Sequence, residues 1–249
     1  DQRWLYLLPL ASLSHSADGL PIPYSTNADF SLATVNPIDR RRRFGVESHL
    51  DYALEPALSA VRMKQETQLP SSYNPRAREF AASLYERSSS TEAFVELLLR
   101  HFREQSFYYS FEPAKLGTHS VDEFLFTTRE GFCEHYASAL VFMLRSVGIP
   151  SRVVLGYQGG VISEDGKSIS VREKDAHAWA EYWVAQRGWV RVDPTSAVAP
   201  DRLRLGADEG LDFEQIDHQF ELFGEKFDVS NIALLRFLNS QYNLSLIHI

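Results

Sequence analysis

The chain has 249 residues, of which 44% are hydrophobic, 12% aromatic and 23% charged. This globular composition excludes long disorder, collagen and coiled coil. With 25 Lys and Arg against 33 Asp and Glu, the net charge of −8 argues against a nucleic-acid partner. A single cysteine, Cys133, excludes an internal disulfide and a cysteine-rich zinc site, and we expect no metal and no cofactor.

The two ends suggest a piece of a longer protein. The first residue is Asp1 rather than Met, and the chain stops abruptly at Ile249. No run of 18 or more apolar residues occurs, so we expect this fragment to be soluble.

Residues 1–68 are predicted to form a β-rich accessory region that is itself incomplete. An apolar run from Trp4 to Leu10 is bounded by a Ser-rich stretch, and short strands are expected at 29–35 and 43–50. Residues 69–75 then resemble a linker.

Two helices are predicted between residues 74 and 105. Asn74 is an N-cap candidate followed by Pro at the first helical position. Ser89 and Glu92 have the spacing of a capping box ahead of an apolar run. His101 falls at the edge of the apolar face, where we expect it to pack against the core.

The segment from 106 to 196 predicts an α+β arrangement, a helix packed on an antiparallel sheet. A buried helix is expected from Cys133 to Ser146, ended by Gly148 and Pro150. Strands are expected after it at 152–157, 177–185 and 189–193. The remainder, 198–249, is predicted to be a loop and a helix at 232–239, and to be truncated.

Cys133 is the first candidate for chemistry. It follows Gly131-Phe132 at the predicted start of a helix, where free N–H groups and the helix dipole favour thiolate, the nucleophilic form. A buried structural cysteine is the alternative.

His177 and Asp193 are the next candidates. His177 opens a predicted strand and shares a face with Trp179 and Glu181. Asp193 ends the following strand before Pro194, where its carboxylate can orient an imidazole. The side chains of His177 and Asp193 share a face of the sheet only if the numbers of residues that pair across the two strands add up to an even value. The turn between the strands could hold a bulge, so the sequence leaves this register open.

Together, these three residues have the chemistry of a cysteine acyl-transfer site. The backbone N–H of Cys133 is a candidate oxyanion donor, and Tyr109 is a candidate second donor. Glu134, beside the cysteine, and Trp179, beside the histidine, are candidates for ordering the site. His135 cannot join Cys133 in a zinc site, because the two point in different directions on a helix.

Four segments in order resemble the transglutaminase-like superfamily: Gly131–Ala139, Gly148–Tyr157, Asp175–Glu181 and Val192–Thr195. The resemblance covers roughly residues 75–197, and Asp122–Phe126 makes it most similar to bacterial membrane-anchored TgpA-type proteins.

The resemblance implies a papain-like, transglutaminase-like core over 69–197, with Cys133 as nucleophile, His177 as base and Asp193 as its partner. It further implies a protein-glutamine gamma-glutamyltransferase that acts on protein or peptide Gln and Lys side chains. The domain would lie on the periplasmic side of the bacterial inner membrane, between transmembrane helices.

Two other functions stay open. The same triad would serve a thiol peptidase or amidase, which differs in admitting water rather than an amine. A non-catalytic binding domain could also keep the fold, although such domains usually lose a triad residue.

Overall fold

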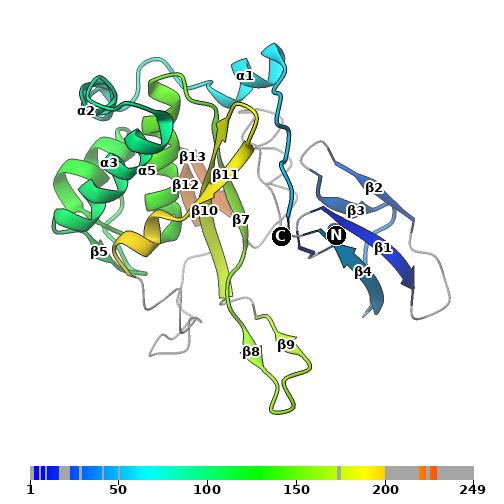
Figure 1. Ribbon diagram of the computed structural model, residues 1–249. Helices are drawn as coiled ribbons and strands as arrows, with labels where there is room; N and C mark the ends of the chain where they lie inside the picture. Colours follow the sequence, from blue (N-terminus) through cyan, green and yellow to red (C-terminus); the bar gives the residue numbers. More distant parts are fainter. Residues whose placement is uncertain are drawn as a thin grey trace.

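The computed structural model shows a group of short N-terminal strands and a larger helix-and-sheet body (Figure 1). The residues it describes are 3–5, 7–8, 10–16, 23–27, 30–40, 42–49, 51–172, 175–199, 219–222 and 225–228. The helix expected at 232–239 lies outside them. Among the described residues, no helix is long and apolar enough to cross a bilayer.

Four N-terminal strands form two antiparallel pairs, β1 with β4 and β2 with β3. They are β1 (Ala11–Ser16), β2 (Tyr24–Thr26), β3 (Leu32–Thr34) and β4 (Phe44–Ser48). The strands expected at 29–35 and 43–50 are therefore confirmed. The Ser-rich stretch, expected to bound a strand, is itself β1, because pairing with the distant β4 outweighs its local turn preference.

Helices precede the nucleophile candidate and continue through it. They are α1 (Ala60–Glu66), α2 (Pro75–Tyr85), α3 (Thr91–Glu104), α4 (Ser120–Glu123) and α5 (Cys133–Ser146). The pair expected between 74 and 105 is α2 and α3, and α1 was not expected. The cap of α3 is Ser90 rather than Ser89, since the Ser90 hydroxyl accepts the N–H of Ala93 at 3.1 Å.

Asn74 does precede α2, but its side chain caps a different helix. Its Oδ1 accepts the N–H groups of Val121 and Asp122 in α4, at 3.1 and 3.2 Å. In return, the Asp122 carboxylate accepts the N–H groups of Arg76 and Ala77 in α2, at 3.0 and 2.7 Å. Each helix thus supplies the cap of the other, which fixes their mutual position.

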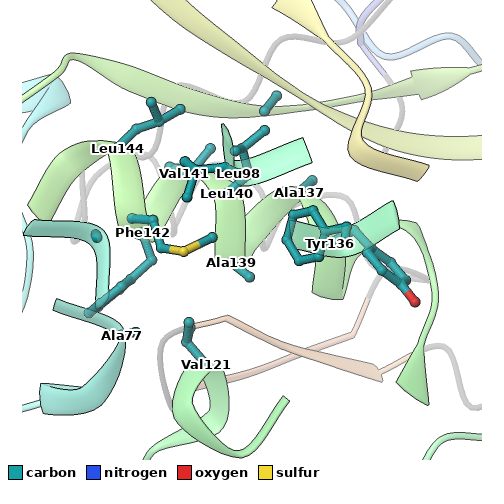
Figure 2. Close-up of a cluster of buried hydrophobic side chains, with 14 of the residues drawn as sticks. Ala77, Leu98, Val121, Tyr136, Ala137, Ala139, Leu140, Val141, Phe142 and Leu144 are labelled. Atoms are coloured by element: carbon teal, nitrogen blue, oxygen red, sulfur yellow. The ribbon is translucent and has the colours of Figure 1, made fainter. Parts of the chain in front are cut away.

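Helix α5 is the centre of the core. All residues from Tyr136 to Leu144 are buried. Figure 2 shows the labelled apolar side chains of this run in one cluster with Ala77 of α2, Leu98 of α3 and Val121 of α4. The helix ends where expected, with Gly148 in the left-handed region at φ +83°.

The main sheet has the strand order β11-β10-β7, all antiparallel. Its strands are β7 (Ser151–Tyr157), β10 (Ala176–Val184) and β11 (Gly188–Val192), which confirms the three predicted strands. One face presents Ala178, Ala180 and Tyr182 to the α5 core. By alternation, His177, Trp179, Glu181 and Trp183 share the opposite face.

A π-helical turn, Phe124–Thr128, follows α4, and a 3-10 turn, Pro194–Ala197, follows β11; the remaining strands form short pairs. They are β5 (Tyr108–Tyr109) with β6 (Glu130–Gly131), β8 (Val161–Ile162) with β9 (Ile169–Ser170), and β12 (Gln219–Leu222) with β13 (Glu225–Asp228). The β8–β9 hairpin extends away from the sheet, beyond the end at which β10 begins (Figure 1).

A strap, residues 51–58, runs along β11. The N–H of Trp189 donates to the Leu54 carbonyl at 3.0 Å, and the indole of Trp183 donates to the Glu55 carbonyl at 2.8 Å. The approach is so close that a Cβ on Gly188 would lie 2.0 Å from the Leu54 oxygen. Gly188 also has φ +78°, so both the strap and the turn require glycine there.

Gly188→Ala is therefore expected to lower the free energy of unfolding by more than about 2 kcal/mol, through steric clash and backbone strain together. Gly166→Ala is the matched control, because φ is +68° there but no heavy atom lies within 4 Å of the added carbon. Urea unfolding of both variants gives the comparison. Equal losses would contradict the steric role of the strap.

Candidate active site

Cys133 is the first residue of α5 and the only cysteine of the chain, so its thiol is in no disulfide, and it is 9% exposed. Strands β5 and β6 pair in parallel and place Tyr109 opposite Gly131. Gly131 lies two residues before Cys133, so Tyr109 is brought to the start of α5. The backbone N–H of Cys133 donates to the Tyr109 hydroxyl at 3.3 Å. The sulfur and the oxyanion candidates therefore occupy one end of the helix.

Tyr109 is held from several sides. Its ring lies parallel to that of Tyr136, at 6.3 Å and 7° between planes, and meets Phe111 edge-on at 5.3 Å. The Tyr136 hydroxyl donates to the carbonyl of Tyr108 at 2.9 Å, which fixes the backbone of β5. The phenol oxygen beside Cys133 thus has a defined position.

His177 and Asp193 meet across the sheet. The register pairs Ala180 with Val192, an even sum, so the two side chains lie on one face. His177 Nε2 lies 2.7 Å from Asp193 Oδ2. The other carboxylate oxygen, Oδ1, accepts the N–H of Thr195 at 3.0 Å, so the carboxylate is fixed at both oxygens.

The charge balance at His177 favours imidazolium. Burial alone lowers the pKa of His177, but hydrogen bonds from the ring to Asp193 and Cys133, and the charges of both, raise it to about 9. Because Nε2 faces Asp193, Nδ1 is the ring nitrogen left for the sulfur. A cationic ring beside a thiol favours the thiolate.

The two residues after Cys133 behave differently. Burial, and then the charge of Cys133, raise the pKa of Glu134 well above its usual range. Burial lowers the pKa of His135 to about 4. The neutral His135 ring accepts the N–H of Phe132 at 3.3 Å through Nδ1, so it caps α5.

Trp179 lies beside the imidazole. Its ring is 6.3 Å from that of His177 with 25° between the planes, and it is fully buried at 0% exposure. The guanidinium of Arg191 covers the same indole at 3.9 Å. We did not single out Arg191 from the sequence, although its place two residues before Asp193 puts both on one face of β11.

His101 lies away from this site, packed against Phe80 at 4.7 Å and Phe107 at 5.5 Å, at the core edge where we expected it. Within the described part of the chain, no group of three or more His, Cys, Asp or Glu side chains is arranged to hold a metal ion.

Two solved structures resemble the described structure closely. The crystal structure of the periplasmic domain of TgpA from Pseudomonas aeruginosa has a TM-score of 0.77 at 39% identity, over 84% of this chain and 71% of that chain. The same domain bound to ethylmercury gives 0.75 at 39% identity, over 81% and 70%.

Sequence comparisons agree. A protein-glutamine gamma-glutamyltransferase of P. aeruginosa is 40% identical over 210 residues, which are 84% of this chain and 30% of that protein. The uncharacterized protein YebA of Bacillus subtilis is 34% identical over 135 residues, 51% of this chain and 18% of that protein. The chain thus spans less than a third of these relatives. The model of the transglutaminase-like superfamily matches residues 78–194, and the chain belongs to that family.

Proposed function

We propose that this chain is the catalytic domain of a transglutaminase-type acyltransferase, with Cys133 as nucleophile, His177 as proton carrier and Asp193 as orienting carboxylate. One observation carries the proposal: the His177 ring joins Asp193, at 2.7 Å, to Cys133 at the start of α5. The name of the P. aeruginosa relative, protein-glutamine gamma-glutamyltransferase, supports the type of reaction.

In the first half-reaction, the Cys133 thiolate attacks the carboxamide carbon of a glutamine side chain. As the tetrahedral intermediate collapses, the C–N bond breaks and the His177 imidazolium gives its proton to the leaving nitrogen. Ammonia departs, and a thioester remains on Cys133 beside a neutral imidazole.

In the second half-reaction, the neutral amine of a lysine side chain attacks the thioester. His177 accepts a proton from the attacking nitrogen, the C–S bond breaks, and an isopeptide bond forms. The thiolate and imidazolium are restored. Water in place of the amine would give a glutamate side chain, which is deamidation.

The developing oxyanion would accept two hydrogen bonds, one from the backbone N–H of Cys133 and one from the Tyr109 hydroxyl. The 3.3 Å contact between these two groups supports the assignment, because one oxygen atom can reach both. Trp179 would keep water from the His177–Asp193 bond, and Glu134, whose pKa is raised by burial and by the charge of Cys133, would help to order the start of α5.

The substrates would be proteins or peptides that present Gln and Lys side chains. We place the domain on the periplasmic side of a bacterial inner membrane, in a longer protein anchored by transmembrane helices. The similarity to a domain described as periplasmic supports this location.

Cys133→Ala tests the nucleophile. With a glutamine donor peptide and a labelled primary amine, the wild type is expected to yield product containing the amine, and the variant to lose nearly all of it. Circular dichroism controls for folding. Activity in the folded variant would refute the assignment. Hydrolysed donor without the amine, or a cleaved peptide bond, would instead favour the amidase or peptidase reaction.

The rate of donor acylation is expected to depend on the imidazolium of His177. Because the pKa of His177 is raised to about 9, kcat/KM for ammonia release should fall as pH rises through about 9. The raised pKa also stabilises the folded protein. This contribution to the free energy of unfolding is fully present below the ordinary pKa of 6.5 and is lost as the pH rises from there through about 9.

Asp193→Asn is the matched variant for this pH dependence. It removes the charge that raises the pKa of His177, so the alkaline limb is expected at a lower pH than in the wild type. An alkaline limb that does not move would show that Asp193 does not set the protonation of the ring.

Tyr109→Phe is expected to lower kcat for acylation by about a hundredfold with little change in KM, because it removes one donor from the oxyanion. Tyr108→Phe is the control, since that neighbouring ring is 64% exposed. If Tyr109→Phe were as fast as the wild type or faster, the hydroxyl would only cap the N–H of Cys133 before substrate binds.

A further inference from the structure

Beside His177, the sheet carries an arginine side chain, Arg191, to which the proposed reaction gives no role. Arg191 stands opposite Glu181 in the β10–β11 register and two residues before Asp193. Alternation puts its side chain on the face of His177 and Trp179. Its guanidinium carbon lies 3.9 Å from the centre of the Trp179 indole, within cation–π range.

The Trp179 ring therefore lies beside two very different groups. The first group is the His177 imidazole on the same strand, β10. The two ring centres are 6.3 Å apart and the ring planes differ by 25°. From the neighbouring strand the Trp179 ring is covered by Arg191. Although Arg191 is itself exposed, Trp179 is at 0% exposure. Arg191 thus forms the outer cover of the ring that flanks the proposed proton carrier.

Neighbouring carboxylates also stabilise the positive charge of the Arg191 guanidinium. Burial of the guanidinium against the indole lowers its pKa, and the charges of Asp193 and Glu181 oppose this effect. An arginine side chain loses rotamer freedom when fixed in one position. Here the carboxylates of Glu181 on β10 and Asp193, directly after β11, offset that cost.

We propose that Arg191 is a positioning residue for the acyl-transfer reaction. It clamps the Trp179 indole against His177, and so keeps the imidazole in the plane from which it reaches both Asp193 and Cys133. This inference rests on the proposed function, since it assigns a role at the same site.

A second arginine on the same face makes a useful contrast. Arg152 lies opposite Glu181 on the other neighbouring strand, pairs with it at 2.7 Å and stacks on Trp189 at 4.0 Å, but it is fully buried and its guanidinium covers Trp189 rather than Trp179. That stack contributes to the core. Arg191 makes the same kind of stack from an exposed position, so its replacement should alter catalysis more than folding.

The test compares Arg191→Met, which keeps an apolar cover but removes the cation, with Arg191→Lys, which keeps a cation. In Arg191→Met, kcat for a glutamine donor is expected to fall roughly tenfold while KM stays within about twofold, as for a misplaced catalytic group. Arg191→Lys should recover much of the loss. Arg187→Met is the control, because Arg187 is exposed and pairs with Glu92 at 2.9 Å.

Thermal unfolding of each variant distinguishes a loss of active-site geometry from a general loss of folding stability. An unfolding midpoint near that of the wild type with the lower kcat supports the proposal. Wild-type kcat in Arg191→Met overturns it, as does a parallel loss of activity and thermal stability. A wild type that acylates no glutamine donor would instead sink the proposed function. The rate at which iodoacetamide alkylates Cys133 would then still report on the site, and equal rates in wild type and Arg191→Met would overturn the positioning role.

Discussion

Burial of α5 is the constraint on which the rest of the structure depends. Each large apolar side chain that this helix removes from water contributes about 1.5–3 kcal/mol, and the run from Tyr136 to Leu144 is buried without a break. A helix packed on several sides cannot rotate or slide by a residue without opening cavities. Its first residue, Cys133, is therefore fixed with respect to β10, which carries His177.

The charged groups at that end are stabilised by one another. Burial disfavours a protonated imidazole, yet the pKa of His177 is raised because Asp193 and Cys133 both face it. Asp193 is oriented by the residues after it: Pro194 ends the strand and begins a short turn, and the N–H of Thr195 holds the second carboxylate oxygen. The local sequence Asp-Pro-Thr thus fixes the carboxylate that faces His177.

Much of the core could be predicted from the sequence because its signals are local. Helix α5 has a continuous apolar pattern and a glycine stop, and the three motif-bearing residues could be named before their contacts were known. The register of β10 with β11 could not, since a bulge in the turn would have reversed the face of Asp193. The reciprocal caps of Asn74 and Asp122 join positions 48 residues apart, a distance that no local rule spans. Arg191 was accessible from alternation alone, but an isolated arginine on a strand carries no chemical signature.

The two-residue ladder of β5 with β6 has a consequence for how such a site diversifies. It fixes the phenol of Tyr109 against the helix start before the chain enters residues 110–118. Beyond Phe111, whose ring still packs on Tyr109, changes in the length or composition of that loop need not disturb the contact between Tyr109 and Cys133.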